Sequence, residues 1–302
     1  MNPAYLDTGN LQIFVTAGDT PEPIPGALVR VSDPENGQIL EEAATDASGQ
    51  TPFIELPAPP MELSVAEGEA GQQRPYAVYN VTITAGGRET LHIGGVEVLP
   101  TGRSIQRAAL SPARNGSFNV RNLLLAPHAL WGPPSTRQPE EEVKPLPEPE
   151  GLVVLPDPVI PEFIVVHDGR PEDPSAPNYW IRFKDYIKNV ACSEIYSTWK
   201  TEAIKANVLA ILSFTLNRVY TEWYRGKGYN FTITSSTAFD QSFVYGRTVF
   251  EEIGVVVDDL FTTYVTREAI SQPLLTQYCD GRRVQCGGLS HWGSHALGEQ
   301  GW

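Results

Sequence analysis

Basic residues and cysteines are scarce in this chain of 302 residues. It has 22 lysines and arginines against 36 acidic residues, which gives a formal net charge of −14. A nucleic-acid partner requires a basic face, and an anionic membrane surface requires a basic segment. Three cysteines are too few for a disulfide-based scaffold. The sequence therefore predicts a globular protein with no nucleic-acid partner and no membrane partner.

Long apolar runs are also missing. No stretch approaches the roughly 18 consecutive apolar residues that span a bilayer. The segment from Met1 to Asn10 has no basic start and no apolar centre, so we expect no standard secretory signal.

Residues 1–112 have the pattern of an all-β domain. Leu11, Ile13 and Val15 alternate with polar residues, as in a half-buried strand, and Ala27, Val29 and Val31 repeat the pattern. Turn signals such as Asn36-Gly37 and Gly86-Gly87 separate these runs. Short strands at this spacing predict a β-sandwich. The strings "PIPGALVRV" and "TDASGQT" resemble the carboxypeptidase-regulatory-like sandwich modules.

Residues 113–150 differ in composition from both flanks. The string "PPSTRQPEEEVKPLPEPEG" is rich in proline and glutamate, so it is expected to be extended and exposed. One reading is a plain spacer between domains. The other is a hinge that proteases cut, because exposed and unpaired backbone is where nicking concentrates.

Residues 151–302 predict an α+β domain. A short helix is expected at 183–191, and a long one at about 201–224 with one apolar stripe. A further helix is expected at about 249–265, where Thr248 and Glu251 suggest a capping box. Strands are expected at 231–235 and 274–278.

Three strings stand out in this second domain: "FKDYIKNVACSEIYSTWKTEAIKANVLAILSFTLNR", "TAFDQSFVYGR" and "GGLSHWGSHALGEQGW". Through them the domain resembles the SpoIID/LytB family of peptidoglycan lytic enzymes. The order of sandwich, Pro/Glu-rich linker and catalytic domain is similar to that of the clostridial spore cortex-lytic enzymes of the SleC type. Family chains continue beyond the point where this one ends, so the resemblance implies that the C-terminal part is missing at Trp302.

The resemblance implies a proenzyme stored in the spore and located in the cortex or outer spore layers. Its expected partners are the cortex peptidoglycan and a subtilisin-like germination protease, which removes the N-terminal region. This favours the hinge reading of the linker, with a cut somewhere between Pro133 and Leu155. No cofactor is expected.

Glu194 matches the acidic position of the family and is the expected catalytic residue. A lytic transglycosylase needs one acid to protonate the glycosidic oxygen, after which the muramic C6 hydroxyl closes on C1. Such an acid requires a raised pKa, usually through apolar burial. Tyr186, Tyr196 and Trp199 are the expected wall. The alternative is a solvated loop carboxylate, which is the common state of glutamate.

Seven further residues are expected to bind the glycan: Ser193, Tyr196, Asp240, Gln241, Tyr245, Ser290 and Trp292. Amides and phenols suit sugar hydroxyls because they interact with both donors and acceptors. For Asp240, Gln241 and Tyr245, a structural hydrogen-bonding cluster is an equally good reading. Asp240 is also the candidate base if the reaction is hydrolysis.

The cysteines leave several readings open. Cys279 and Cys286, with His291 and His295 following, are compatible with a disulfide or paired thiols, with a zinc site or with inert thiols. Cys192 with His167 is a weak candidate for a nucleophile and base.

A different class of function also stays open, namely a non-catalytic protein of the spore that binds peptidoglycan or acts as a scaffold.

Overall fold

The computed structural model describes residues 6–18, 20–66, 73–113, 119–134, 136–137, 139–147 and 156–302. The chain divides into two compact units. Unit 1 comprises residues 1–127, 196–198 and 245–252, and unit 2 comprises residues 128–195, 199–244 and 253–302.

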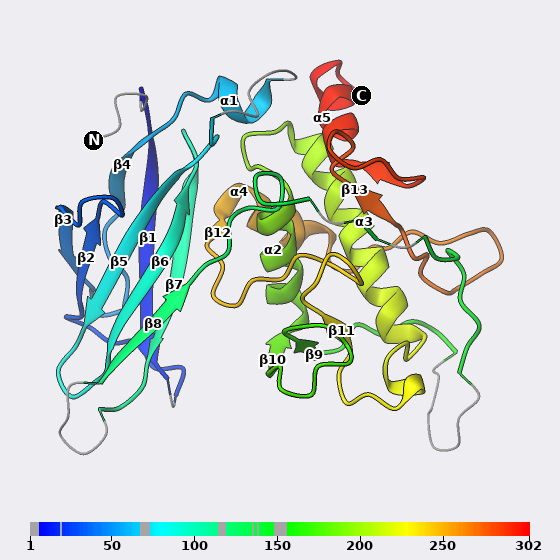
Figure 1. Ribbon diagram of the computed structural model, residues 1–302, viewed down its shortest axis with the longest axis horizontal. Helices are drawn as coiled ribbons and strands as arrows, with labels where there is room; N and C mark the ends of the chain where they lie inside the picture. The colour runs from blue at the N-terminus through cyan, green and yellow to red at the C-terminus, as the bar shows by residue number, and fades with distance from the viewer. Residues whose placement is uncertain are drawn as a thin grey trace. The chain divides into compact units, whose positions relative to one another are not determined.

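Unit 1 is a β-sandwich of two sheets (Figure 1). One sheet has the order β12 (Val249–Phe250), β7 (Arg103–Leu110), β1 (Asp7–Ala17) and β4 (Ile54–Ala58). The other has the order β3 (Ile39–Ala44), β2 (Leu28–Ser32), β5 (Ala77–Thr84), β6 (Thr90–Val98) and β8 (Val120–Leu124). The short helix α1 spans Glu62–Val65. The predicted all-β fold is confirmed.

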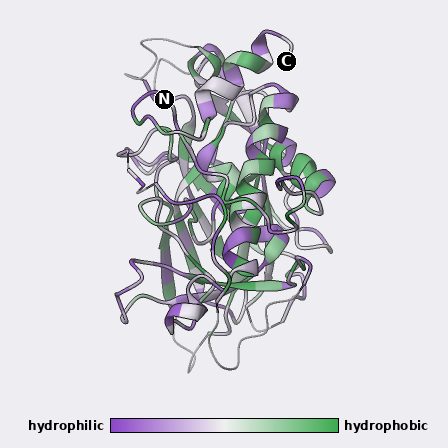
Figure 2. Ribbon diagram, turned by 90° about the vertical axis from the view of Figure 1, so that its right-hand side faces the viewer, coloured by the Kyte–Doolittle hydropathy of each residue, from purple (hydrophilic) through white to green (hydrophobic). Residues whose placement is uncertain are grey.

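Alternation of apolar residues builds the interior of this sandwich. Leu11, Ile13 and Val15 are all 0% exposed, while the residues between them are half-buried. Strand β5 alternates in the same way over its eight residues. Hydrophobic residues are concentrated in the strands and helices (Figure 2). The sandwich continues beyond residue 112, because β8 pairs in parallel with β6.

Unit 2 has both helices and strands (Figure 1). A small sheet has the order β10 (Asn178–Arg182), β9 (Phe163–His167) and β11 (Ile233–Thr234). The other elements are α2 (Phe183–Glu194), α3 (Thr201–Tyr220), η2 (Arg225–Lys227), α4 (Glu251–Leu260), β13 (Tyr278–Cys279), β14 (Leu289–Ser290) and α5 (His291–Glu299). Helix α4 begins in the last two residues of unit 1.

Two predicted helices end or begin differently from the expectation. Helix α3 stops at Tyr220, because Glu222 takes a positive φ of 48°, which a helix cannot accommodate. The capping box at α4 is wrong: the hydroxyl of Thr248 donates to Oε1 of Gln106 at 2.8 Å instead.

The segment expected to be an exposed linker is largely folded. His128 is 0% exposed, Leu130 is 9% exposed and Lys144 is 6% exposed. These residues belong to unit 2, and the segment is bound to other parts of that unit by an ion pair and by hydrogen bonds to its backbone. The prediction of a fully solvated spacer is therefore wrong at these three positions, while Pro133, Pro134 and Leu146 are exposed as expected. The expected start of the second domain at Gly151 lies outside the described residues, as does the stretch 148–155 of the expected cleavage region.

Within the described residues, no helix has both the length and the apolar character needed to cross a bilayer.

Candidate active site

Glu194 is the last residue of α2, and its side chain is buried. Only 2% of its surface is exposed. The carbonyl end of a helix carries a partial negative charge, which disfavours a second negative charge at that place. Helix α2 therefore favours the protonated form of this carboxyl group.

The carboxyl group of Glu194 has one partnered and one unpartnered oxygen. The backbone N–H of Ser242 donates to Oε1 at 2.8 Å. Oε2 and the neighbouring hydroxyl of Tyr278 are both buried, and neither completes a hydrogen bond of normal geometry within the described residues. Burial raises the pKa of Glu194 to about 7, although the Ser242 N–H, the Tyr278 hydroxyl and the charge of Arg137 act in the opposite direction.

Aromatic rings line this carboxyl group. Burial and the charges of Asp240 and Glu194 raise the pKa of Tyr186, and burial and the charge of Glu194 raise the pKa of Tyr278. Tyr186 was expected in this wall; the charge of Glu194 acts on it, and its role as part of the wall stays a prediction. The ring centre of Trp199 is 5.0 Å from that of Trp292 and 4.8 Å from that of His295, and its place in the wall stays a prediction.

The loop that supplies Ser242 is fixed to α2 by an amide side chain. Nδ2 of Asn189 donates to the carbonyl of Val244 at 2.8 Å, and Oδ1 of Asn189 accepts from the N–H of Val244 at 3.0 Å. The segment "FDQSFVYG" therefore does lie beside the acid, as the family resemblance implied. It makes the contact through the backbone of Ser242, which the sequence did not single out.

Arg137 brings a positive charge close to the acid. Its guanidinium carbon is 4.5 Å from the ring centre of Phe214 and 5.4 Å from that of Tyr278. Its Nε and Nη1 atoms are enclosed and have no hydrogen-bond partner among the described residues. Its charge lowers the pKa of Glu194, so it lies within electrostatic reach of the carboxylate.

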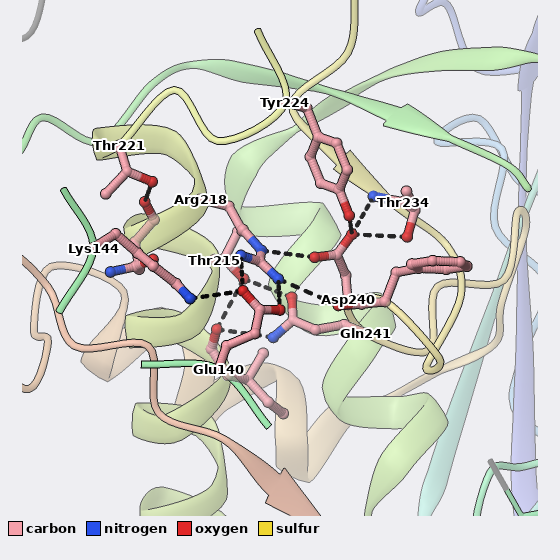
Figure 3. Close-up of polar contacts among 12 residues, drawn as sticks. Glu140, Lys144, Thr215, Arg218, Thr221, Tyr224, Thr234, Asp240 and Gln241 are labelled. Carbon is pink, nitrogen blue, oxygen red and sulfur yellow. Dashed lines mark hydrogen bonds and ion pairs between the residues drawn. The ribbon is translucent and has the colours of Figure 1, made fainter. Parts of the chain in front are cut away.

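Asp240 belongs to a separate buried network (Figure 3). Its Oδ1 accepts from Nε of Arg218 at 2.7 Å. Its Oδ2 accepts from the hydroxyl of Tyr224 at 2.7 Å and from the N–H and hydroxyl of Thr234 at 2.9 and 2.7 Å. Both oxygens are occupied, so the structural reading of Asp240 holds. Neither sugar binding nor activation of water suits it.

Gln241 is also a structural residue. Its Oε1 accepts from the hydroxyls of Tyr186 and Thr215, at 3.0 and 2.7 Å, and its Nε2 donates to the carbonyl of Ile211 at 3.1 Å. The side chain is 0% exposed, so it presents no group to a glycan in this form. Its contact with Tyr186 fixes one ring of the wall around Glu194.

The two serines expected to bind glycan hold local structure instead. The hydroxyl of Ser193 donates to the carbonyl of Asn189, one turn earlier in α2, at 2.8 Å. The hydroxyl of Ser290 caps α5 by accepting from the N–H of Gly293 at 2.8 Å. The hydroxyl of Ser193 is therefore engaged and buried, while a sugar contact by Ser290 stays a prediction.

The three aromatic candidates are divided between the units. Tyr196 and Tyr245 belong to unit 1, where the first is buried and the second is 40% exposed. In unit 2 the ring of Trp292 lies against Trp199, and the guanidinium carbon of Arg282 is 3.4 Å from the centre of that ring. A sugar-binding role for these three residues stays a prediction.

Cys279 and Cys286 form a disulfide, which selects the clasp among the open readings. Within the described residues, no group of three or more histidine, cysteine or acidic side chains is arranged to hold a metal ion. Burial lowers the pKa of His291 to about 3, and its Nδ1 is 2.6 Å from Oδ1 of Asn207. His291 therefore acts as a neutral structural residue at neutral pH.

The reading of Cys192 as a nucleophile with His167 as base gains no support. Cys192 is buried in α2 and forms no disulfide. Both ring nitrogens of His167 are engaged: Nδ1 is 2.7 Å from Oδ1 of Asn178, and Nε2 is 2.9 Å from the carbonyl oxygen of Arg170. Neither nitrogen is available to take a proton from a thiol.

Comparisons with known proteins assign no family. No protein-family model matches the chain. No curated protein sequence matches it.

Solved structures match only part of the chain. They include the minor pilin GBS52 of Streptococcus agalactiae, 15% identical over 38% of this chain and 49% of that one, with a TM-score of 0.26. Another is 5-hydroxyisourate hydrolase of Klebsiella pneumoniae, 19% identical over 34% of this chain and 91% of that one, with a TM-score of 0.22. The TIE protein of Bacillus anthracis is 15% identical over 35% of this chain and 17% of that one, with a TM-score of 0.25. These similarities are too weak to support any conclusion about function.

Proposed function

We propose that unit 2 cleaves the glycan strands of peptidoglycan by acid catalysis, as a SpoIID/LytB-type lytic transglycosylase. The observation that carries this proposal is the carboxyl group of Glu194, buried at the end of α2 with one oxygen held and the other unpartnered. A pKa of about 7 leaves a substantial protonated fraction at neutral pH, as a general acid requires.

The chemistry needs this one carboxyl group. Glu194 donates its proton to the oxygen of the MurNAc–GlcNAc bond, and the bond between C1 and that oxygen breaks through an oxocarbenium-like state. The C6 hydroxyl of the same muramic residue then bonds to C1, and its proton goes to the carboxylate. The products are a 1,6-anhydro end and a free GlcNAc hydroxyl. No water nucleophile is consumed, so the engagement of Asp240 is no obstacle.

The burial of Glu194 supports the proposal of a proenzyme. A glycan strand cannot reach a carboxyl group that is 2% exposed, so residues around it must move or leave before catalysis. The resemblance to clostridial spore cortex-lytic enzymes of the SleC type supplies the setting. The substrate would be spore cortex, a subtilisin-like germination protease would activate the enzyme, and unit 1 would be a pro-domain of the carboxypeptidase-regulatory-like kind.

Product analysis of digested cortex tests the proposed reaction. The full chain, before and after limited subtilisin digestion, is incubated with spore cortex, and the fragments are identified by mass spectrometry. We expect anhydro-muramic ends from the digested parent, and a loss of roughly 100-fold or more with Glu194→Gln. Asp185→Asn, an exposed residue of the same helix, is the matched control and should keep the parental rate. An unchanged rate with Glu194→Gln would disprove the mechanism.

A second candidate is a non-catalytic protein that binds peptidoglycan. The burial of Glu194, which a glycan strand cannot reach in this form, favours a protein without turnover. It predicts that the digested protein binds intact glycan and releases no anhydro ends.

A further inference from the structure

Residues 128–147 occupy a surface of unit 2 that binds them along most of their length. We propose that this segment acts as a peptide ligand of the rest of unit 2, held by side chains and backbone on α2, α3 and the 267–283 region, and that it stays bound when the chain is cut after it. The contacts fall into three groups, each on a different part of unit 2.

The first group surrounds Glu194. The N–H of Ala129 donates to the carbonyl of Ser193 at 2.8 Å. His128 accepts from the N–H of Leu130 through Nδ1 at 3.2 Å, so its Nε2 carries the proton that it donates to the carbonyl of Ile195 at 3.2 Å. The segment therefore binds the backbone on both sides of the proposed catalytic acid.

Arg283 continues this first group from the disulfide loop. Its two terminal nitrogens donate to the carbonyls of Gly132 and Ala129 at 2.6 and 2.7 Å. Its Nε pairs with Asp280 at 2.7 Å, which fixes the guanidinium in position. Unit 2 thus supplies a preorganised donor for two carbonyls of the segment.

The second group is a buried ion pair (Figure 3). The carboxylate of Glu140 accepts from Nη1 and Nη2 of Arg218 at 3.1 and 2.8 Å. It also pairs with Lys144 of the same segment at 2.8 Å, and the Lys144 ammonium lies 4.7 Å from the ring centre of Trp223. The side chains of Arg218 and Lys144 are 1% and 5% exposed and that of Glu140 is 20% exposed, so solvent screens these interactions only in part.

The third group consists of paired amides. The side chain of Gln272 accepts from the N–H of Lys144 at 2.8 Å and donates to its carbonyl at 3.0 Å. Gln277 donates to the carbonyl of Glu140 at 3.1 Å, and the N–H of Leu275 donates to the carbonyl of Glu142 at 2.9 Å. This pattern is that of an extended peptide bound through its backbone.

The binding surface gives activation two steps rather than one, an inference that rests on the proposed function. Scission beyond residue 147 breaks no contact in the three groups, so the segment remains beside Glu194. Departure of the segment is the second step. It removes Ala129 and His128, which bind the carbonyls of Ser193 and Ile195, and it removes Arg137.

Hydrogen exchange on a cut chain tests the bound state directly. Residues 148–155 of the full chain are replaced by the recognition sequence of a sequence-specific protease, and exchange is followed by mass spectrometry before and after cutting. We expect peptides from 139–147 to keep their protection after the cut. Exchange of these peptides at the rate of an unstructured chain would overturn the proposal.

Two neighbouring carboxylates of the segment provide a matched pair of variants. In the cut chain, Glu140→Gln should speed exchange of 139–147 by about tenfold or more, because it leaves the buried guanidinium of Arg218 without the negative charge of Glu140. Glu142→Gln should change it less than about twofold, because Glu142 pairs with Arg267 at an exposed position. Equal effects of the two variants would contradict the proposed surface.

A second variant covers the case in which Glu140→Gln disturbs α3. Gln272→Leu removes both bonds to the backbone of Lys144 and leaves the ion pair intact, so it should also speed exchange of 139–147 in the cut chain. Parental exchange with Gln272→Leu would argue against the bound peptide.

Cortex digestion by the same samples separates the two proposals. Cleavage by the cut parent should lag behind that by cut Glu140→Gln, whereas absence of cleavage in every sample, with protection retained, would disprove only the enzymatic function.

Discussion

Glu140 and Glu194, two acidic residues of unit 2, have carboxyl groups with opposite surroundings. Glu140 meets Arg218 and Lys144, and although burial raises its pKa, these partners lower it to about 2. Glu194 meets aromatic rings and one backbone N–H, and burial raises its pKa to about 7. The first group is charged at neutral pH, while the second is divided between its charged and neutral forms.

The two surroundings also differ in how many polar atoms are satisfied. The Arg218 network engages both oxygens of Glu140 and of Asp240. Around Glu194, by contrast, the atoms Oε2 of Glu194, Oη of Tyr278 and both Nε and Nη1 of Arg137 are buried without partners among the described residues. A satisfied network stabilises a fold, whereas unsatisfied buried groups cost stability and mark places where chemistry or binding occurs. This contrast separates Glu140 and Asp240 from Glu194, the proposed catalytic acid.

The largest expected effect is on the satisfied network. Arg218→Met leaves the carboxylates of Asp240 and Glu140 without their cation, and Asp240 is 0% exposed. We expect the free energy of unfolding of the full chain to fall by about 3–5 kcal/mol, as for other broken buried pairs. Urea denaturation at pH 7 measures this loss.

Arg267→Met is the matched control for that loss. Arg267 pairs with Glu142 of the same segment, but both side chains are more than half exposed, at 58% and 54%. Its removal should cost less than about 1 kcal/mol. If the two variants lost equal stability, the difference between a buried and an exposed pair would not exist here.

The next effect is a gain, not a loss, in the free energy of unfolding, and it concerns Glu194. Between pH 4.5, the ordinary pKa of a glutamate, and about pH 7, the folded chain keeps this proton while the unfolded chain has lost it. The group therefore lowers stability progressively as pH rises through this range, and the loss is complete above pH 7. Glutamine has no such loss. Relative to the parent, Glu194→Gln should gain roughly 3 kcal/mol between pH 4.5 and pH 8.

Urea denaturation at the two pH values measures this gain. Asp185→Asn, exposed on the same helix, should show little change with pH relative to the parent. A parental pH profile in Glu194→Gln would mean that Glu194 has an ordinary pKa, and the contrast with Glu140 would then disappear.

Sequence patterns predicted the strands of unit 1 well. The alternation at Leu11, Ile13 and Val15 arises locally, since each residue of a half-buried strand faces one side of the sheet. Glu194 was singled out through a local resemblance of short strings, and its catalytic role stays a prediction. Its burial was expected only because a general acid needs a raised pKa, and the sequence did not indicate which residues bury it.

Residues far apart in the sequence were the ones that pattern reasoning missed. Arg137 and Glu140 lie in a stretch whose proline and glutamate content indicates a solvated linker, yet Arg218 lies 78 residues beyond Glu140 and holds it in unit 2. Tyr278 had no local signal except its place beside Cys279. For Asp240 and Gln241, polar composition did not distinguish a sugar contact from a structural bond, because that depends on what α3 places opposite them.

The smallest expected effect is a change in the pKa of Glu194 when the nearby charge of Arg137 is removed. The guanidinium of Arg137 acts against burial and lowers the pKa of Glu194, as does the Tyr278 hydroxyl. Arg137→Gln removes the charge and leaves Ser242 and Tyr278 in place, so the pKa of Glu194 should rise further above its ordinary value. Titration of the Glu194 carboxyl carbon by NMR in the full chain measures the shift, with Arg267→Gln as the control that removes an exposed charge elsewhere. A lower or unchanged pKa in Arg137→Gln would show that this cation does not act on the acid. A higher pKa would show that Arg137, and with it the segment 128–147, keeps Glu194 more charged than the rest of unit 2 does. The charge state of the acid would then depend on the presence of that segment.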